Sequence, residues 1–125
     1  MRRKSRESAF KVIYGNLFET QPNLEGIYAE DALNQEEIEY SNKIVEVYNQ
    51  NEIQIKDKLG AILKGYDVES VYKIDLALII LAYCENVYLD IPKAVAINET
   101  LEISKLYSTD KSPSFINGIL KDLLK

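Results

Sequence analysis

Histidine and tryptophan are absent from this 125-residue chain, and cysteine occurs once. Without histidine the chain lacks the commonest general base and the commonest metal ligand of proteins. One cysteine cannot form an intramolecular disulfide, and such scarcity is typical of a protein from a reducing cytoplasm. No nucleophile–base pair and no set of metal ligands occurs at a suitable spacing, so the sequence predicts no catalytic site, no metal and no cofactor.

Long apolar runs are missing too, with the exception of residues 76–84. This run is less than half the length of about 20 residues that crosses a bilayer, and no signal-peptide pattern follows the charged start of the chain. A surface helix is apolar on one face, whereas this run is apolar on every face. We therefore predict a buried central helix over about 70–88. The polar residues that we expect where it emerges from the core are Lys73, Asp75, Glu85 and Asn86.

The remaining sequence has apolar residues at helical spacing, and no segment alternates with period two over a useful length. We expect further helices over about 5–19, 34–50 and 52–63, and two more that begin near Pro92 and Pro113. Residues 20–34 stay open between a loop and a short helix. The sequence thus predicts an all-α fold of six or seven short helices, forming a single domain over residues 1–125.

Local signals place several helix ends. Asn34 followed by Glu37 matches a reciprocal N-terminal cap, and Gly65 fits the position just after the helix over 52–63. Ser112 is expected to cap the last helix, with Pro113 as its first residue.

Charge is the property that points to a partner. The net charge of −5 argues by itself against nucleic acid, but residues 1–11 hold five cations against one acid, a net of +4, which leaves −9 on the rest. Arginine forks match phosphate oxygens, and clustered cations release counterions from nucleic acid. A phosphate-binding arm and a frayed, solvated terminus both fit this start. The residues concerned are Arg2, Arg3, Lys4 and Arg6.

Three further residues are candidates for binding. Phe115 and Asn117 at a helix start have the chemistry to stack on and hydrogen-bond an unpaired base, although an aromatic at helical spacing is more often part of the core. Asp75 fits either a cap or ion pair at the start of the central helix, or an exposed acid that meets a basic partner. Cys84 is interpreted as a small buried hydrophobe and not as a nucleophile.

Three stretches together resemble one family. They are residues 2–14, residues 75–85, and a Pro-x-x-Val-Ala-Ile-Asn-Glu run over 92–99 followed by Phe-Ile-Asn-Gly at 115–118. In combination they resemble the NusB family of bacterial transcription antitermination factors. The resemblance implies two small helical bundles packed together, no catalysis and a cytoplasmic location. It also implies binding to the boxA segment of ribosomal RNA leaders as a pair with the small-subunit ribosomal protein NusE, followed by assembly with other Nus factors and RNA polymerase.

Carried onto this chain, the resemblance assigns residues to two surfaces. The RNA side comprises Arg2, Arg3, Lys4 and Arg6, with Phe115 and Asn117 nearby. Tyr14 and Asp75 match positions near the partner-protein surface.

The chain departs from the family in its central helix, where Leu76 and Ile80 replace two frequent arginines and Cys84 replaces a tyrosine. Fewer cations there predict weaker RNA binding by the isolated protein and more reliance on the partner. Alternatively, the apolar residues deepen a protein interface, and the chain is a monomer or a homodimer.

Three hypotheses remain. The first is a non-catalytic RNA-binding antitermination factor, in which Arg6 and Phe115 lie on the same side of the molecule and grip one RNA strand. The second is a helical RNA-docking module of the kind appended to ribosomal RNA methyltransferases; the absence of a glycine-rich cofactor loop and a catalytic cysteine pair favours the first hypothesis over it. The third is an adaptor whose acidic surface meets a basic protein.

Overall fold

The computed structural model describes residues 2–64 and 71–125, and within these ranges it contains seven α-helices, one π-helix and no strand. This confirms the all-α prediction. The elements are α1 (Arg2–Asn16), α2 (Leu24–Glu30), α3 (Gln35–Gln50), α4 (Glu52–Ile62), α5 (Lys73–Tyr83), the π-helix η2 (Cys84–Tyr88), α6 (Lys93–Tyr107) and α7 (Ser112–Leu123). Among the described residues, none of the helices has the length and apolar character that a membrane crossing requires.

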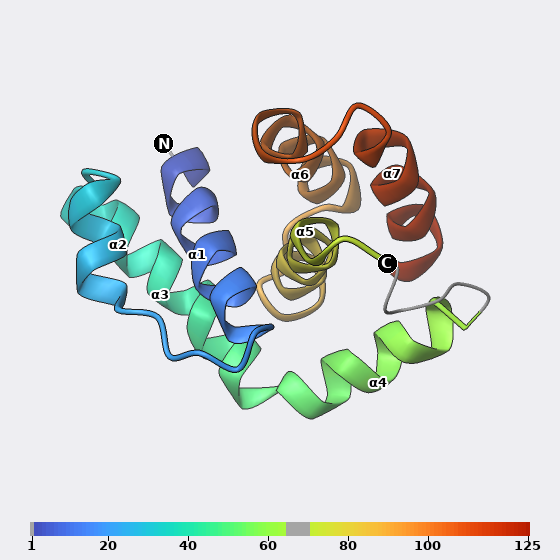
Figure 1. Ribbon diagram of the computed structural model, residues 1–125, viewed down its shortest axis with the longest axis horizontal. Helices are drawn as coiled ribbons and strands as arrows, with labels where there is room; N and C mark the ends of the chain where they lie inside the picture. Colours follow the sequence, from blue (N-terminus) through green and yellow to red (C-terminus); the bar gives the residue numbers. More distant parts are fainter. Residues whose placement is uncertain (1, 65–70) are drawn as a thin grey trace.

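The helices are arranged on two sides of α5 (Figure 1). On one side α1 packs against both α3 and α5, and α2 lies against α1. On the other side α6 and α7 pack against α5 and against each other. The result is the expected pair of small bundles, with α5 as the element common to both.

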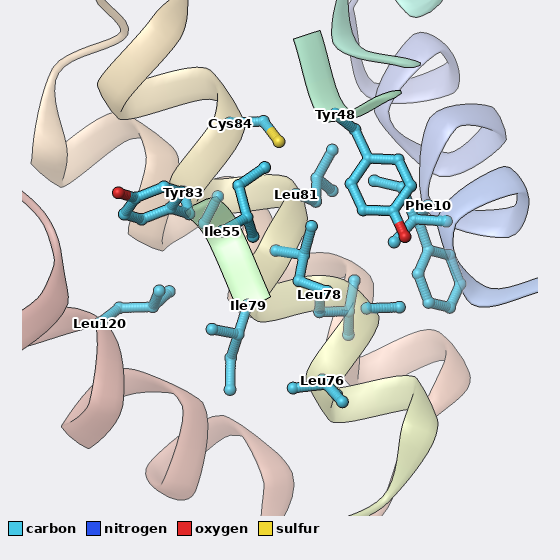
Figure 2. Close-up of a cluster of buried hydrophobic side chains, with 14 of the residues drawn as sticks. Phe10, Tyr48, Ile55, Leu76, Leu78, Ile79, Leu81, Tyr83, Cys84 and Leu120 are labelled. Atoms are coloured by element: carbon cyan, nitrogen blue, oxygen red, sulfur yellow. The ribbon is translucent and has the colours of Figure 1, made fainter. Parts of the chain in front are cut away.

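Helix α5 is surrounded by apolar side chains from both bundles. Figure 2 shows Phe10 and Tyr48 on one side of it and Leu120 of α7 on the other. Leu78 and Ile79, which point to different neighbours, are both 0% exposed. Because α5 has packing partners on all sides, an amphipathic stripe would leave polar groups buried, and this explains why the sequence is apolar on every face.

Of the four polar residues expected where α5 emerges, only Lys73 is partly exposed, and the prediction is wrong for the other three. Asp75, Glu85 and Asn86 are all buried. Each is retained inside because it has partners: Asp75 accepts hydrogen bonds from serine hydroxyls of the α6–α7 connection, and Asn86 bonds to Ile91 and to the backbone of Lys125. The partners of Glu85 form the centre of the candidate site.

Helix α1 starts and ends three residues earlier than expected. After Asn16 the chain turns, with Glu19 in the left-handed region at φ 60°. Pro22 then packs against α1 so closely that a Cβ on Gly15 would lie 2.6 Å from the Pro22 Cγ atom. Gly15 is therefore used for this close approach.

One of the three expected helix caps is confirmed, one is wrong and one lies outside the described residues. Asn34 accepts from the backbone N–H of Glu37, and the Glu37 carboxylate accepts from the Asn34 N–H, both at 2.9 Å, which confirms the reciprocal cap. The open segment 20–34 contains the short helix α2, capped by Asn23. The expected cap at Ser112 is wrong: Ser112 is the first residue of α7, Lys111 is at the cap position, and the Ser112 hydroxyl donates to Asp75. The expected role of Gly65 lies outside the described residues.

Truncation of a core side chain of α5 should destabilise the folded protein. Leu78→Ala should lower the free energy of unfolding by about 2–5 kcal/mol, because it leaves a cavity at a fully buried position,. Leu106→Ala is the matched control, since Leu106 is 69% exposed and surface truncations change stability by about 0.5 kcal/mol or less. Urea unfolding followed by circular dichroism measures both, and equal losses would contradict the central position of α5.

Candidate nucleic-acid interface

The basic start of the chain forms the first turns of α1. Residues 2–6 are helical, and the first turn contains no acidic residue. Cations at a helix N-terminus are opposed by the positive end of the helix dipole, which favours anions. Groups outside α1 must therefore offset this charge, and the structure supplies them.

Arg6 is held inside the molecule and is 5% exposed. Its Nε donates to both carboxylate oxygens of Glu85, at 2.7 and 2.9 Å, and its Nη1 donates to Glu99 Oε1 at 3.1 Å. Burial by itself lowers the pKa of Arg6, but the hydrogen bond and charge of Glu85, together with the charges of Tyr40 and Glu99, raise this pKa above its usual value. Arg6 is thus a fully charged internal contact between α1, η2 and α6.

Glu85 is the acceptor at the centre of this arrangement, with a side chain that is 0% exposed. Besides Arg6 it accepts a hydrogen bond from the hydroxyl of Tyr40 on α3. Burial and the neighbouring Glu85 charge raise the pKa of Tyr40, so its hydroxyl stays protonated and donates. Glu85 lies in the π-helix η2, a wider turn of the kind that recurs at functional sites,.

Arg3 and Glu99 form a second ion pair closer to the surface. Arg3 Nη2 donates to Glu99 Oε2 at 3.0 Å, and the two side chains are 40% and 25% exposed. Glu99 therefore binds one arginine with each oxygen, Arg3 with Oε2 and Arg6 with Oε1. The Nε of Arg3 is buried and has no hydrogen-bond partner in the described part of the chain.

Arg2 and Lys4 are exposed. The guanidinium of Arg2 lies 4.2 Å from the centre of the Tyr40 ring, a cation–π contact that holds it against α3,. Acidic side chains at the start of α3 line the same hollow as Arg2. The arm therefore presents two exposed cations and one half-exposed cation, of which Arg2 and Arg3 are held by contacts with Tyr40 and Glu99.

Phe115 and Asn117 lie on α7, and both are half-buried. Phe115 packs against the apolar core. The structure does not bring Arg6 and Phe115 together, because α5 and α6 lie between α1 and α7 (Figure 1). Two interaxial spacings correspond to roughly 16–20 Å, so one small group cannot contact both.

Tyr14 and Asp75 are related through Ser108, which lines the same cleft as Tyr14 and donates a hydrogen bond to Asp75. Tyr14 lines an open cleft with Phe18, Tyr72, Tyr107 and Ser108. Asp75 is not an exposed acid: it is 3% exposed, and its two oxygens accept from Ser108 and Ser112. Asp75 thereby fixes Ser108 at the edge of the cleft.

The cleft contains aromatic residues that sequence reasoning did not assign to a site. The Tyr14 and Phe18 rings are 5.1 Å apart; Tyr14 is near the end of α1, and Phe18, four positions later, is in the turn that follows it. Such a spacing is a signal for a shared face. The contributions of Tyr72 and Tyr107 come from distant parts of the chain and have no local signal.

The replaced arginine positions face away from the arm. Leu76 and Ile80 line a groove with Leu17 and Leu59, between the end of α1 and α4. Leu17 is 11 positions beyond Arg6, which corresponds to roughly 16 Å along a helix. The geometry favours a role for Leu76 and Ile80 in apolar packing or a protein contact over the loss of an RNA contact beside the arm.

The single cysteine and the potential metal ligands of the described part of the chain bear on catalysis and metal binding. Cys84 is buried, and desolvation together with the Glu85 charge raises the pKa of its thiol to about 12, so that it stays neutral. In the described residues no group of three or more potential metal ligands gathers.

Comparison with known proteins identifies close relatives. The family model described as "NusB family" matches residues 3–125. The transcription antitermination protein NusB of Clostridium novyi (strain NT) is 36% identical, over 99% of this chain and 98% of its own length. NusB of T. maritima superposes with a TM-score of 0.85 at 28% identity, covering 98% of this chain and 89% of that chain. A chain in the crystal structure of the antitermination factors NusB and NusE in complex with dsRNA has the same fold, with a TM-score of 0.85, 21% identity and coverage of 98% and 94%.

The buried pair of Arg6 and Glu85 should be essential to stability. Glu85→Gln should lower the free energy of unfolding by about 3–5 kcal/mol, because it leaves the guanidinium of Arg6 buried without its main counter-charge. Glu102→Gln removes the same charge from an exposed pair with Lys105 and should cost about 0.5 kcal/mol or less. Chemical denaturation compares the two, and a loss no larger than that of the control would show that the pair is dispensable.

Proposed function

The chain belongs to the NusB family of transcription antitermination proteins, and we propose that it binds the boxA segment of ribosomal RNA leaders together with the small-subunit ribosomal protein NusE. The observation that carries the RNA part is that Arg2, Arg3 and Lys4 stand together in the first turn of α1, where the helix dipole opposes cations,. An anion bound from outside would remove this conflict.

The proposed factor acts by positioning, in the cytoplasm, as one domain and without catalysis. It would hold the RNA and NusE in one complex that other Nus factors and RNA polymerase can join. The C. novyi relative, matched over 98% of its own length, is itself a transcription antitermination protein. That match supports a factor of this kind over a module appended to a methyltransferase.

The RNA contacts divide into two groups. Arg2, Arg3 and Lys4 bind phosphates, and Arg6 acts on the RNA indirectly, because its donors hold Glu85 and Glu99. Phe115 and Asn117 form the second group on α7, where a base would stack and be hydrogen-bonded. Since α6 lies between the groups, they contact different nucleotides of one strand.

The partner contact is proposed at the aromatic cleft. Tyr14 offers a ring and a hydroxyl there, the combination that is enriched at protein interfaces,. Asp75 contributes by holding Ser108 at the cleft edge and does not reach the partner itself. Self-association through the same cleft is the alternative, with a homodimer in place of the complex.

Salt dependence tests the arm. Three phosphate contacts on a single strand predict that log affinity for boxA-like RNA falls with log salt at a slope of about −2. Replacing Arg2, Arg3 and Lys4 by Ala should flatten this slope and leave the melting temperature nearly unchanged. Replacing Lys58, Lys64 and Lys105, which are also exposed, makes the same change in net charge and should retain the slope. The titration is read by fluorescence anisotropy with and without NusE, and wild-type binding by the arm variant would contradict the assignment.

A Tyr14→Ala variant tests the cleft. It should weaken binding to purified NusE about tenfold, as for a buried interface aromatic, and leave binding to RNA alone unchanged. Ile53→Ala is the control, because Ile53 is 75% exposed on α4, outside the cleft. Calorimetry measures the affinity and sedimentation measures self-association. Unchanged NusE binding with a lower dimer fraction would identify the cleft as a homodimer surface.

A further inference from the structure

A carboxylate of α6 already contacts the arm where an RNA phosphate would bind. We propose that Glu99 competes with RNA for Arg3. In the free protein the Glu99 carboxylate is paired with the guanidinium of Arg3, and an RNA phosphate must displace it. This inference rests on the proposed RNA binding and adds a residue that sets the affinity of that site.

The two carboxylates beside the arm differ in accessibility. Glu85 is fully buried and contacts Arg6 through both oxygens. Glu99 has a 25% exposed side chain and contacts Arg6 through one oxygen only. Arg6 therefore keeps its main partner when Glu99 leaves, and the displacement does not require the buried pair to open.

Arg3 is incompletely satisfied by Glu99. One Glu99 oxygen binds Arg3 Nη2, the other is taken by Arg6, and the Nε of Arg3 remains buried without a partner. A bidentate acceptor pairs with two guanidinium donors at once and forms the stronger contact. A phosphate has the oxygens for this, whereas Glu99 shares its two oxygens between two arginines.

The solvent exposure of the pair between Arg3 and Glu99 also favours replacement of the carboxylate by a phosphate. Ion pairs that reach solvent are weak and open readily, while buried pairs do not. The Arg3 side chain is 40% exposed and the Arg6 side chain is 6% exposed. An incoming phosphate can therefore reach Arg3 and repel the Glu99 carboxylate, while the position of α1 stays fixed.

The test measures RNA affinity after removal of the competitor. Glu99→Gln should bind boxA-like RNA about two- to fivefold more tightly than wild type, the range expected for an exposed pair. Its salt slope should stay at about −2, because the same three phosphates are contacted and only the competing carboxylate is removed. Glu102→Gln is the control on the same helix, with the same charge change at the exposed Lys105 pair, and should change affinity less.

A double-mutant cycle shows whether Glu99 acts through Arg3. In an Arg3→Ala background the gain from Glu99→Gln should disappear, because coupled residues are non-additive. A gain that persists would assign the effect to general charge and overturn the proposal. Equal or weaker binding by Glu99→Gln, with wild-type binding intact, would show that Glu99 orients Arg3 for RNA and would overturn it as well.

A second measurement uses the wild-type protein and does not depend on the variant folding. The carbon resonance of the Glu99 side-chain carboxyl group should shift when boxA-like RNA is added, while that of Glu85 should stay in place. If RNA binds and the Glu99 signal does not move, the competition by Glu99 is contradicted and the proposed RNA binding is not. No binding by wild type or by Glu99→Gln, with or without NusE, contradicts the proposed function, and the two failures are thus distinguishable.

Discussion

The structure depends on one buried carboxylate. Glu85 accepts from Arg6 and from Tyr40, and so connects η2 to α1 and α3. Taking a carboxylate and a guanidinium out of water is expensive, and the cost is offset only when the geometry is good and the remaining donors are satisfied. Here the Glu85 carboxylate accepts three hydrogen bonds, two of them from the Nε atom of Arg6. The direction of α1, and with it the position of the whole arm, follows from this contact.

The same contact decides what the arm can offer to a ligand. It removes Arg6 from the surface and leaves Arg2, Arg3 and Lys4 at the beginning of a helix whose dipole disfavours them,. The acids of α3 beside Arg2 and the carboxylate of Glu99 compensate part of this charge within the molecule. The positive patch is therefore smaller than the sequence indicates, and a partner protein that adds RNA contacts would matter more for affinity.

The sequence predicted the features that depend on neighbouring residues. The uniform apolar run located α5, and the spacing of Asn34 and Glu37 located the start of α3. The site was only partly predictable, because Arg6 and Glu85 are 79 positions apart and no periodicity signals such a pair. A carboxylate at the end of an apolar run fits an exposed helix end as well as a buried ion pair, and only the position of Arg6 separates the two.

Helix α6 lies between the two groups of proposed RNA contacts. It separates α1 from α7 (Figure 1), so a strand that reaches both the arm and Phe115 has to cross it. Glu99 stands on α6 at the edge nearest the arm, where it already binds Arg3 and Arg6. A negative group on this path repels any polyanion, so a strand that makes further contacts displaces it more completely than one held by charge alone. Binding at both ends of the path would supply such contacts, and a short or unrelated strand would not. The position of one half-exposed carboxylate thereby gives the site a means to favour a strand that contacts α1 and α7 together.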